Sequence, residues 1–127
     1  MAVQKNINIQ NKKARFEFEI LDKFVAGIQL TGTEIKSIRL SQARITESFC
    51  EFNDRGELFI VNMYIQEYMF GHHFNHKPKS ERRLLLHKRE LRSLKKDVEA
   101  KGNTIVPLRL FINDRGFAKL EIALAKG

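Results

Sequence analysis

Apolar and polar residues alternate over several short stretches of the chain, and this pattern predicts β-strands. Between residues 15 and 20 every second position is apolar, and the positions between them carry Arg or Glu. A period of two is typical of a strand with one buried face, so we predict a first strand here. The strand is expected to resume over residues 25–30, with Gly27 marking a bulge or bend.

Two hairpins are predicted from the sequence Asn-Asp-Arg-Gly, which occurs at residues 53–56 and again at 113–116. Asn and Asp start a turn by hydrogen bonding to their own backbone, and Gly supplies the positive φ that closes it. Alternating segments flank both turns. We predict strands over residues 45–52 and 57–63 in the first hairpin, and over 104–112 and 117–125 in the second.

A capping box predicts a short helix after residue 30. Thr31 can accept a hydrogen bond from the backbone of Glu34, whose carboxylate can reach back to the backbone of Thr31. Two isoleucines follow at helical spacing, so the helix should reach about Leu40. Gly32 is unusual in a first helical turn, and we expect it to allow another backbone, of the protein or of a ligand, to approach closely.

The segment between the hairpins is less regular. Residues 64–80 contain Gly, Pro and three His, and they are predicted to form a long surface loop. Residues 84–86 are predicted to form a short strand. A second helix is expected over residues 87–101, with Gly102 as a C-cap. Its apolar stripe is narrow, and Lys and Arg cover the remaining faces.

These elements predict a mainly β, single-domain fold over residues 1–127. About six strands with two or three short helices are most economically arranged as a small OB-type β-barrel. Such barrels present one strand face and its loops to nucleic acid. The first ten residues are polar, and we expect them to be flexible.

The charge of the chain is concentrated in two segments. Residues 1–15 carry four basic residues and no acid, whereas residues 77–101 carry ten basic residues against four acids. The formal net charge is +8 over 127 residues, of which 43% are hydrophobic, as in a globular protein. Two basic patches on a folded domain indicate a polyanionic partner, and we predict a folded RNA.

The composition also indicates in which cellular compartment the protein works. The one cysteine, Cys50, cannot form an internal disulfide, and we predict a buried thiol in a reducing cytoplasm. The first ten residues contain no apolar run suited to a signal peptide, and no stretch of about eighteen apolar residues occurs. We therefore expect a cytoplasmic protein with no membrane partner.

Nothing in the sequence makes a positive case for a cofactor, a metal or catalysis. His72, His73 and His76 lie close together, but the nearest carboxylate is Glu67 and no Cys is near, so a zinc site is not expected. Glu67, His72 and His87 contain the groups of an acid–base pair, yet nothing places them against a nucleophile. We therefore expect a protein that is not an enzyme.

The strongest candidate site is the stretch Arg-Arg-Leu-Leu-Leu-His-Lys-Arg-Glu-Leu at residues 82–91. Arg suits bidentate phosphate contacts and stacking on exposed bases. A solvated helix face is the alternative, but too few acids are present to pair with these cations at helical spacing. Residues 11–15, Asn-Lys-Lys-Ala-Arg, can contact phosphates or form a disordered basic tail, and both readings stay open.

Four stretches in order resemble the small protein B (SsrA-binding protein) family. They are residues 11–15, 26–39, 82–91 and the terminal Ala-Leu-Ala-Lys-Gly at 123–127, and the resemblance covers essentially residues 8–127. It implies an OB-type barrel that binds the tRNA-like domain of transfer-messenger RNA and brings it to stalled ribosomes. Alanyl-tRNA synthetase and elongation factor Tu are implied as partners through the RNA, and we expect a monomer.

The resemblance implies which residues face the RNA. Lys and Arg would hold phosphates, while Asn11 and His87 could bond to or stack on unpaired bases. Glu34 can equally serve only the capping box, and Leu85 can equally belong to the core. The residues implied by position are Asn11, Lys12, Lys13, Arg15, Glu34, Lys36, Arg39, Arg82, Arg83, Leu85 and His87, and the basic stretch adds Lys88 and Arg89.

Two departures from the family pattern stand out. Val25 occupies a position where some members carry an acidic residue tied to RNA binding, so the role of that position is in doubt. Members normally continue past the equivalent of Gly127 with a basic tail that enters the empty mRNA path. Without this tail we expect RNA binding to remain and ribosome rescue to fail.

Two other classes of protein compete with this interpretation. A generic OB-type module for ribosomal or single-stranded RNA would need stacking aromatics on its strand face. The chain has no Trp, and most Phe lie on apparent core faces, which counts against that class. A ribonuclease would cleave RNA and would respond to His72→Ala or His87→Ala.

Overall fold

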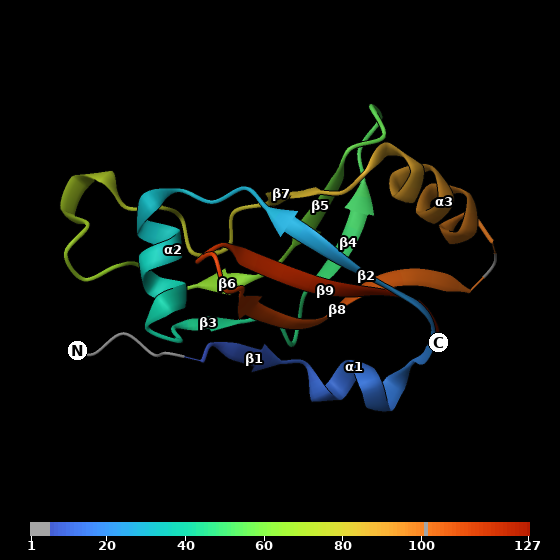
Figure 1. The fold of residues 1–127 in the computed structure, drawn as a ribbon, viewed down its shortest axis with the longest axis horizontal. Coiled ribbons are helices and arrows are strands. Elements are labelled where there is room, and N and C mark those ends of the chain that lie inside the picture. Colours follow the sequence, from blue (N-terminus) through green and yellow to red (C-terminus); the bar gives the residue numbers. More distant parts are fainter. Residues whose placement is uncertain (1–5, 101) are drawn as a thin grey trace.

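Six antiparallel strands close into a barrel in the computed structural model, which describes residues 6–100 and 102–127 (Figure 1). The strand order around the barrel is β8-β4-β5-β7-β2-β9, and β9 pairs back with β8 to close it. The predicted barrel of about six strands is confirmed. Its strands are β2 (Glu19–Ile28), β4 (Phe49–Phe52), β5 (Leu58–Val61), β7 (Arg82–Leu85), β8 (Asn103–Ile112) and β9 (Ala118–Lys126).

Short elements cover the outside and the ends of this barrel. Strand β1 (Asn8–Gln10) adds to the edge of β8, and β3 (Ala43–Arg44) pairs with β6 (Tyr64–Ile65) in a separate two-stranded sheet. In Figure 1, α2 lies at one end of the molecule and α3 at the other. The helices are α1 (Lys12–Glu17), α2 (Gly32–Arg39) and α3 (Lys88–Val98), with a 3₁₀ turn η1 (His72–Phe74).

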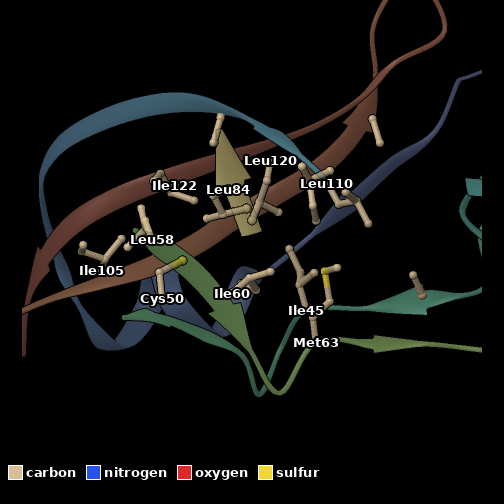
Figure 2. Packing of buried hydrophobic residues seen from close by; sticks show 14 of the residues in the cluster. Ile45, Cys50, Leu58, Ile60, Met63, Leu84, Ile105, Leu110, Leu120 and Ile122 are labelled. Atoms are coloured by element: carbon tan, nitrogen blue, oxygen red, sulfur yellow. The ribbon is translucent and has the colours of Figure 1, made fainter. Parts of the chain in front are cut away.

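The core fills the inside of the barrel with aliphatic side chains (Figure 2). Leu58, Ile60, Ile105 and Leu120 are fully buried, because every second residue of each strand points inward. Cys50 lies among them as a free thiol, as predicted. Burial raises the pKa of this thiol far above its ordinary value, so it is an inert packing group at neutral pH.

Both predicted turns form. The Asn53 side-chain oxygen accepts hydrogen bonds from the backbone N–H groups of Arg55 and Glu57, at 3.0 and 2.9 Å. Gly56 has a φ of +77°, a conformation that costs a residue with a Cβ. The second turn repeats this geometry at residues 113–117.

The second hairpin has the predicted strands, but the first is shorter than predicted. Strand β4 begins at Phe49 because Ser48 bonds back to the carbonyl of Ile45 through both its N–H (3.1 Å) and its hydroxyl (2.6 Å). This tight turn interrupts the chain between β3 and β4. The sequence pattern alone did not reveal it, because the polar residues at 46–48 include no Gly or Pro that would mark a turn.

The capping box of α2 is confirmed. The Thr31 hydroxyl accepts from the Glu34 N–H at 3.4 Å, and the Glu34 carboxylate accepts from the Thr31 N–H at 2.8 Å. The protein's own backbone does not approach Gly32, because a Cβ at this position would meet no other heavy atom within 4 Å, and an approach by a ligand backbone stays a prediction. Close approach occurs instead at Gly27, where a Cβ would lie 3.4 Å from the Cβ of Leu85.

The strand predicted from residue 15 is wrong over its first part. Residues 12–17 form α1, and Phe16, predicted to face the core, is 95% exposed. The helix forms because the Asn11 side chain accepts from the Ala14 N–H at 3.1 Å, which caps its N-terminus. The register irregularity of β2 lies between Ile20 and Asp22 rather than at Gly27.

Three further boundaries differ from the sequence-based expectations. Helix α3 ends at Val98, because the Asn103 amide donates to the Asp97 carbonyl at 2.9 Å and draws the chain away; Lys101 lies outside the described residues. The predicted loop over 64–80 contains β6 and η1, and the strand predicted at 84–86 is β7 at 82–85. We expected residues 1–10 to be flexible. Residues 1–5 lie outside the described range, and residues 8–10 form the ordered strand β1.

Candidate nucleic-acid interface

Strand β7 divides its side chains between the core and the surface. Arg82 and Leu84 point inward and are 3% and 2% exposed. Leu85 and Arg83 point outward, and Leu85 is 46% exposed. The division follows from the two-residue period of a strand. Two neighbouring arginines therefore occupy opposite environments, and Leu85 belongs to the surface rather than to the core.

An apolar spot lies where β2, β7 and β9 meet. Gly27 pairs with Leu85 on one side and with Lys119 on the other, so the three strands approach closely. Val25 and Leu85 are both about half exposed and line a cleft of 370 Å³ together with His87 and Lys119. The Glu90 carboxylate also lines this cleft. Apolar surface beside an imidazole and an ammonium group suits an unpaired base and its phosphate.

A second groove, of 460 Å³, lies between the turn of the first hairpin and α3, next to the apolar spot. Leucines form part of its wall, and Leu85 lines both the groove and the spot. We call this surface the basic groove. Its cations are Arg55, Arg83, Lys88, Arg92 and Lys95.

One carboxylate enters the basic groove. Glu57 accepts a hydrogen bond from the Asn53 amide at 2.8 Å and pairs with Arg83 at 3.0 Å. The Asn53 hydrogen bond, with further contributions from Arg83 and Arg55, lowers the pKa of Glu57, so it stays ionised at neutral pH. Glu57 holds Arg83 in place but also competes with any phosphate for it.

Helix α3 presents its cations without acidic partners. The Glu90 carboxylate accepts from the His87 N–H at 3.2 Å and so stabilises the start of the helix. Within the part of the chain that the structure describes, neither Lys88 nor Arg89 forms an ion pair. Lys88 lines the basic groove, and Arg89 is exposed on the same helix outside it.

Helix α1 carries the N-terminal cations on a fixed element instead of a disordered tail. Lys12, Lys13 and Arg15 are all exposed. Lys13 pairs with Glu47 at 3.3 Å and Arg15 with Glu121 at 3.4 Å. Exposed pairs of this kind contribute only about 0–1 kcal/mol, so phosphates can displace them.

Asn11 anchors α1 and is not exposed. Its amide donates to the Pro107 carbonyl at 2.9 Å, and its backbone N–H donates to the Leu108 carbonyl at 2.8 Å. The side chain is 2% exposed, and its oxygen caps α1 at Ala14. Asn11 therefore positions the three cations of α1 against β8.

Replacing Asn11 should loosen this anchor. We expect Asn11→Ala to lower the free energy of unfolding by about 2–3 kcal/mol, since it removes an N-cap and leaves the Pro107 carbonyl without its donor. Asn11→Ser keeps a capping oxygen and should lose about 1 kcal/mol less. Urea denaturation measures both. Equal stability of Asn11→Ala and the parent protein would contradict the anchoring role.

Glu34 and Arg82 form a buried ion pair. The Arg82 Nε donates to the Glu34 carboxylate at 2.5 Å, and the rest of the guanidinium donates to the carbonyls of Met63, Lys77 and Pro78. The two side chains are 2% and 5% exposed. They join the start of α2 to β7 and to the chain after β6.

The two α2 cations lie away from the basic groove. Lys36 is exposed, and its Nζ lies 5.5 Å from the centre of the Tyr68 ring. Arg39 donates to the Gly116 carbonyl at 3.2 Å. Since α2 and α3 lie at opposite ends of the barrel (Figure 1), these two residues do not share one surface with Lys88 and Arg89.

Several interface residues escaped the sequence-based list. Arg55 lies in the first hairpin turn, and only the closed barrel brings it opposite α3. Arg92 and Lys95 lie in the predicted basic helix, whose spacing from Lys88 places them on a shared face and could have identified them. Lys119 alternates with core residues of β9, a pattern that marks it as outward-facing but not as part of a site.

Neither a cluster of metal-binding side chains nor a membrane-spanning helix is found in the described part. Within residues 6–100 and 102–127, no three His, Cys, Asp or Glu side chains gather closely enough to hold a metal ion. No described helix has the length and apolar character needed to cross a membrane.

Comparisons with known proteins place this chain in one family. The family model described as SmpB protein matches residues 8–127. The SsrA-binding protein of Flavobacterium psychrophilum is 65% identical over 97% of this chain and 81% of that protein. The SsrA-binding protein of Brucella canis is 54% identical over 93% of this chain and 74% of that protein.

A solved structure supports the same grouping. A chain described as "tmRNA-SmpB: a journey to the center of the bacterial ribosome" superposes with a TM-score of 0.78 and 47% identity. The match covers 95% of this chain and 84% of that one. By its sequence and by its fold, the chain belongs to the SmpB protein family.

Proposed function

We propose that this protein binds the tRNA-like domain of transfer-messenger RNA and brings it to stalled ribosomes. The observation that carries the proposal is the apolar spot at Val25 and Leu85 next to the basic groove. A surface that combines apolar area with fixed cations suits a folded RNA with unpaired bases. Relatives named SsrA-binding protein and the tmRNA-SmpB structure support this choice of RNA.

The exposed residues would divide the contacts between phosphates and bases. Cations on α1 and around the basic groove would hold phosphates, which fixes the orientation of the RNA without reading its sequence. Leu85 and His87 would face unpaired bases, and Val25 would add apolar contact. The phosphate-binding set is Lys12, Lys13, Arg15, Arg83, Lys88 and Arg89, with Arg55, Arg92, Lys95 and Lys119 added by the structure.

The buried members of the predicted set would act indirectly. Asn11, Glu34 and Arg82 are each less than 5% exposed, which leaves little of them for a bound RNA to contact. Asn11 would position α1, while the Glu34–Arg82 pair would hold β7 and thereby Arg83 and Leu85. Lys36 and Arg39 would contribute, if at all, from the α2 end of the barrel.

The wider partners would meet this protein through the RNA. Alanyl-tRNA synthetase would act on the acceptor end of the tRNA-like domain, and elongation factor Tu would bind the charged RNA. The surface described above contains no arrangement of nucleophile and base, so the protein would contribute binding rather than chemistry. It would act on the ribosome as part of the RNA complex, in the cytoplasm, as a monomer.

A competition titration tests the proposal. The protein is titrated against a labelled tRNA-like fragment of transfer-messenger RNA, and an elongator tRNA or a single-stranded oligonucleotide competes at fixed, moderate salt. We expect the tRNA-like fragment to be preferred over both competitors, because only it combines the right phosphates with the right unpaired bases.

The competitors separate the alternatives. Equal affinity for all three RNAs would mean that the cations act as a nonspecific polyanion surface, and the proposed function would fail. A preference for the oligonucleotide would favour a generic single-strand module. Leu85→Ala should reduce the preference for the tRNA-like fragment while leaving the affinity for the elongator tRNA unchanged, since it removes no charge.

A further inference from the structure

The loop between β6 and β7, residues 66–81, exposes an unusual amount of aromatic surface. Phe74 is 91% exposed, Phe70 is 64% exposed and Met69 is 58% exposed, all within six residues. In Figure 1 this loop projects past α2, at the end of the molecule opposite α3. Large apolar side chains gathered in one exposed place usually mark a binding site.

This loop is held in one conformation by its own hydrogen bonds. The Asn75 side chain bridges Tyr68, accepting from its N–H at 3.0 Å and donating to its carbonyl at 2.7 Å. The N–H of Gly71 donates to the Tyr68 carbonyl at 2.9 Å, and that of Phe74 to the Gly71 carbonyl at 3.1 Å. The exposed aromatic residues therefore project from an ordered turn.

His76 fastens the loop to the body of the protein. Its two ring nitrogens lie 2.9 Å from the Thr33 hydroxyl and 2.9 Å from the Ile65 carbonyl, and the residue is 9% exposed. The Ile65 N–H in turn donates to the Pro78 carbonyl at 2.9 Å. A ligand that docks on this loop would bind a surface that folding has already ordered. Binding would therefore not incur the entropy cost of ordering the loop.

The polar groups around the aromatic residues favour an anionic partner. Lys36 lies over the Tyr68 ring at 5.5 Å, and Tyr68 packs edge-on against Phe70 with ring centres 5.6 Å apart. The other two lysines of the loop, Lys77 and Lys79, are exposed but line separate pockets, so Lys36 is the cation placed beside the aromatic residues. The two carboxylates of the loop, Glu67 and Glu81, stand near its two ends in sequence.

We propose that this loop binds unpaired RNA nucleotides, with bases stacked on Phe74 and Phe70 and a phosphate held by Lys36. Every base has a π-face, so such a site accepts bases with little sequence preference. The site goes beyond the proposed binding of the tRNA-like domain and does not depend on it. It would let the protein hold a second stretch of RNA at the far end of the barrel.

A short unstructured oligonucleotide tests the site directly. The parent protein and the double variant Phe70→Ala/Phe74→Ala are titrated with a labelled oligouridine of about six nucleotides, a length within the site sizes of single-strand binders. We expect the double variant to bind at least about 5- to 150-fold more weakly, the fold-change for the loss of one stacked base, because it removes both stacking rings. Both substituted residues are exposed, so the fold should be unaffected.

Two controls isolate stacking at the loop. Phe16→Ala removes an equally exposed ring, 95% against 91% for Phe74, but from α1 at a distance from the loop, and it should leave the affinity unchanged. An abasic strand of the same length carries the same charge without bases. It should bind weakly, and equally to the parent and to the double variant.

The preformed shape of the loop supplies a further readout. Asn75→Ala keeps every aromatic ring but removes both hydrogen bonds to Tyr68, so it should weaken oligouridine binding while the thermal midpoint stays near that of the parent. If oligouridine binds the parent and Phe70→Ala/Phe74→Ala equally well, or does not bind the parent at all, the proposal is overturned. Neither outcome would affect the competition with the tRNA-like fragment, which probes the other end of the barrel.

Discussion

Replacing Arg82 with methionine is expected to lower the free energy of unfolding by about 3–5 kcal/mol, the usual effect of removing one partner of a buried ion pair. The change would leave the Glu34 carboxylate buried beside an apolar side chain. It would also remove one donor each from the carbonyls of Met63, Lys77 and Pro78, of which Lys77 and Pro78 keep hydrogen bonds from Ser80 and Ile65. Since small domains are stable by only about 5–15 kcal/mol in total, the loss should be plain in urea denaturation.

A second variant separates charge from hydrogen bonding at this position. Arg82→Met/Glu34→Gln removes both charges and should recover part of the stability lost in Arg82→Met, because no unpaired charge remains inside. If instead Arg82→Met were as stable as the parent and weakened only RNA binding, Arg82 would have to act as a direct phosphate contact. The structural role that we infer from the burial and hydrogen bonds of its guanidinium would then be wrong.

Removing Arg83 and Lys88 together is expected to flatten the salt dependence of RNA binding. Each phosphate contact contributes about 0.7–0.9 to the slope of log K against log salt, so Arg83→Ala/Lys88→Ala should reduce the slope by up to about 2 units. At physiological salt the same change should weaken binding on the order of tenfold to thirtyfold. Both side chains line the basic groove, so the double variant should remove two phosphate contacts from the same region of the surface. Titrations of the tRNA-like fragment at several salt concentrations measure the slope.

Matched variants test whether position matters more than net charge. Lys23→Ala/Lys126→Ala also removes two exposed cations, but from outside the groove, and it should leave the slope nearly unchanged. Glu57→Gln should act in the opposite direction and tighten binding, because it removes the ionised carboxylate that competes for Arg83. A slope that fell equally in both double variants would exclude the groove as a defined contact site.

The elements that depend on local chemistry were predictable from the sequence. An Asn that starts a turn and a Gly that ends it specify both hairpins, whatever lies around them. Thr31 and Glu34 specify the start of α2 in the same way. The six-strand barrel followed from counting these elements. The apolar alternation of the last hairpin gave its strands to within one residue at each end.

The elements that depend on distant neighbours were not predictable in this way. Residues 15–20 alternate like a strand, but the Pro107 carbonyl of β8 holds the Asn11 side chain where it caps a helix. No residue near Asn11 in the sequence indicates that the Pro107 carbonyl will lie beside it. A similar difficulty affects the basic groove, since Arg55 and Lys88 become neighbours only after β5 and β7 pair.

The sequence predicted only in part which residues of the candidate site are buried. In the strand that contains both arginines, the buried Leu84 shares its face with Arg82, so alternation could have marked Arg82 as inward-facing once that strand was placed correctly. The predicted strand began two residues too late to include it. The predicted RNA contacts at exposed positions remain predictions, which the titrations above are designed to test.

The long-range bonds of Asn11 bear on the order in which the protein can assemble as it is made. Asn11 and its partner Pro107 are 96 positions apart, and β2 pairs along most of its length with β9. A chain synthesised from its N-terminus therefore emerges with α1 unanchored and β2 without its longest partner. Distant pairings of this kind also slow folding. The surface that carries the N-terminal cations thus cannot be completed until nearly all of these residues have left the ribosome that makes them.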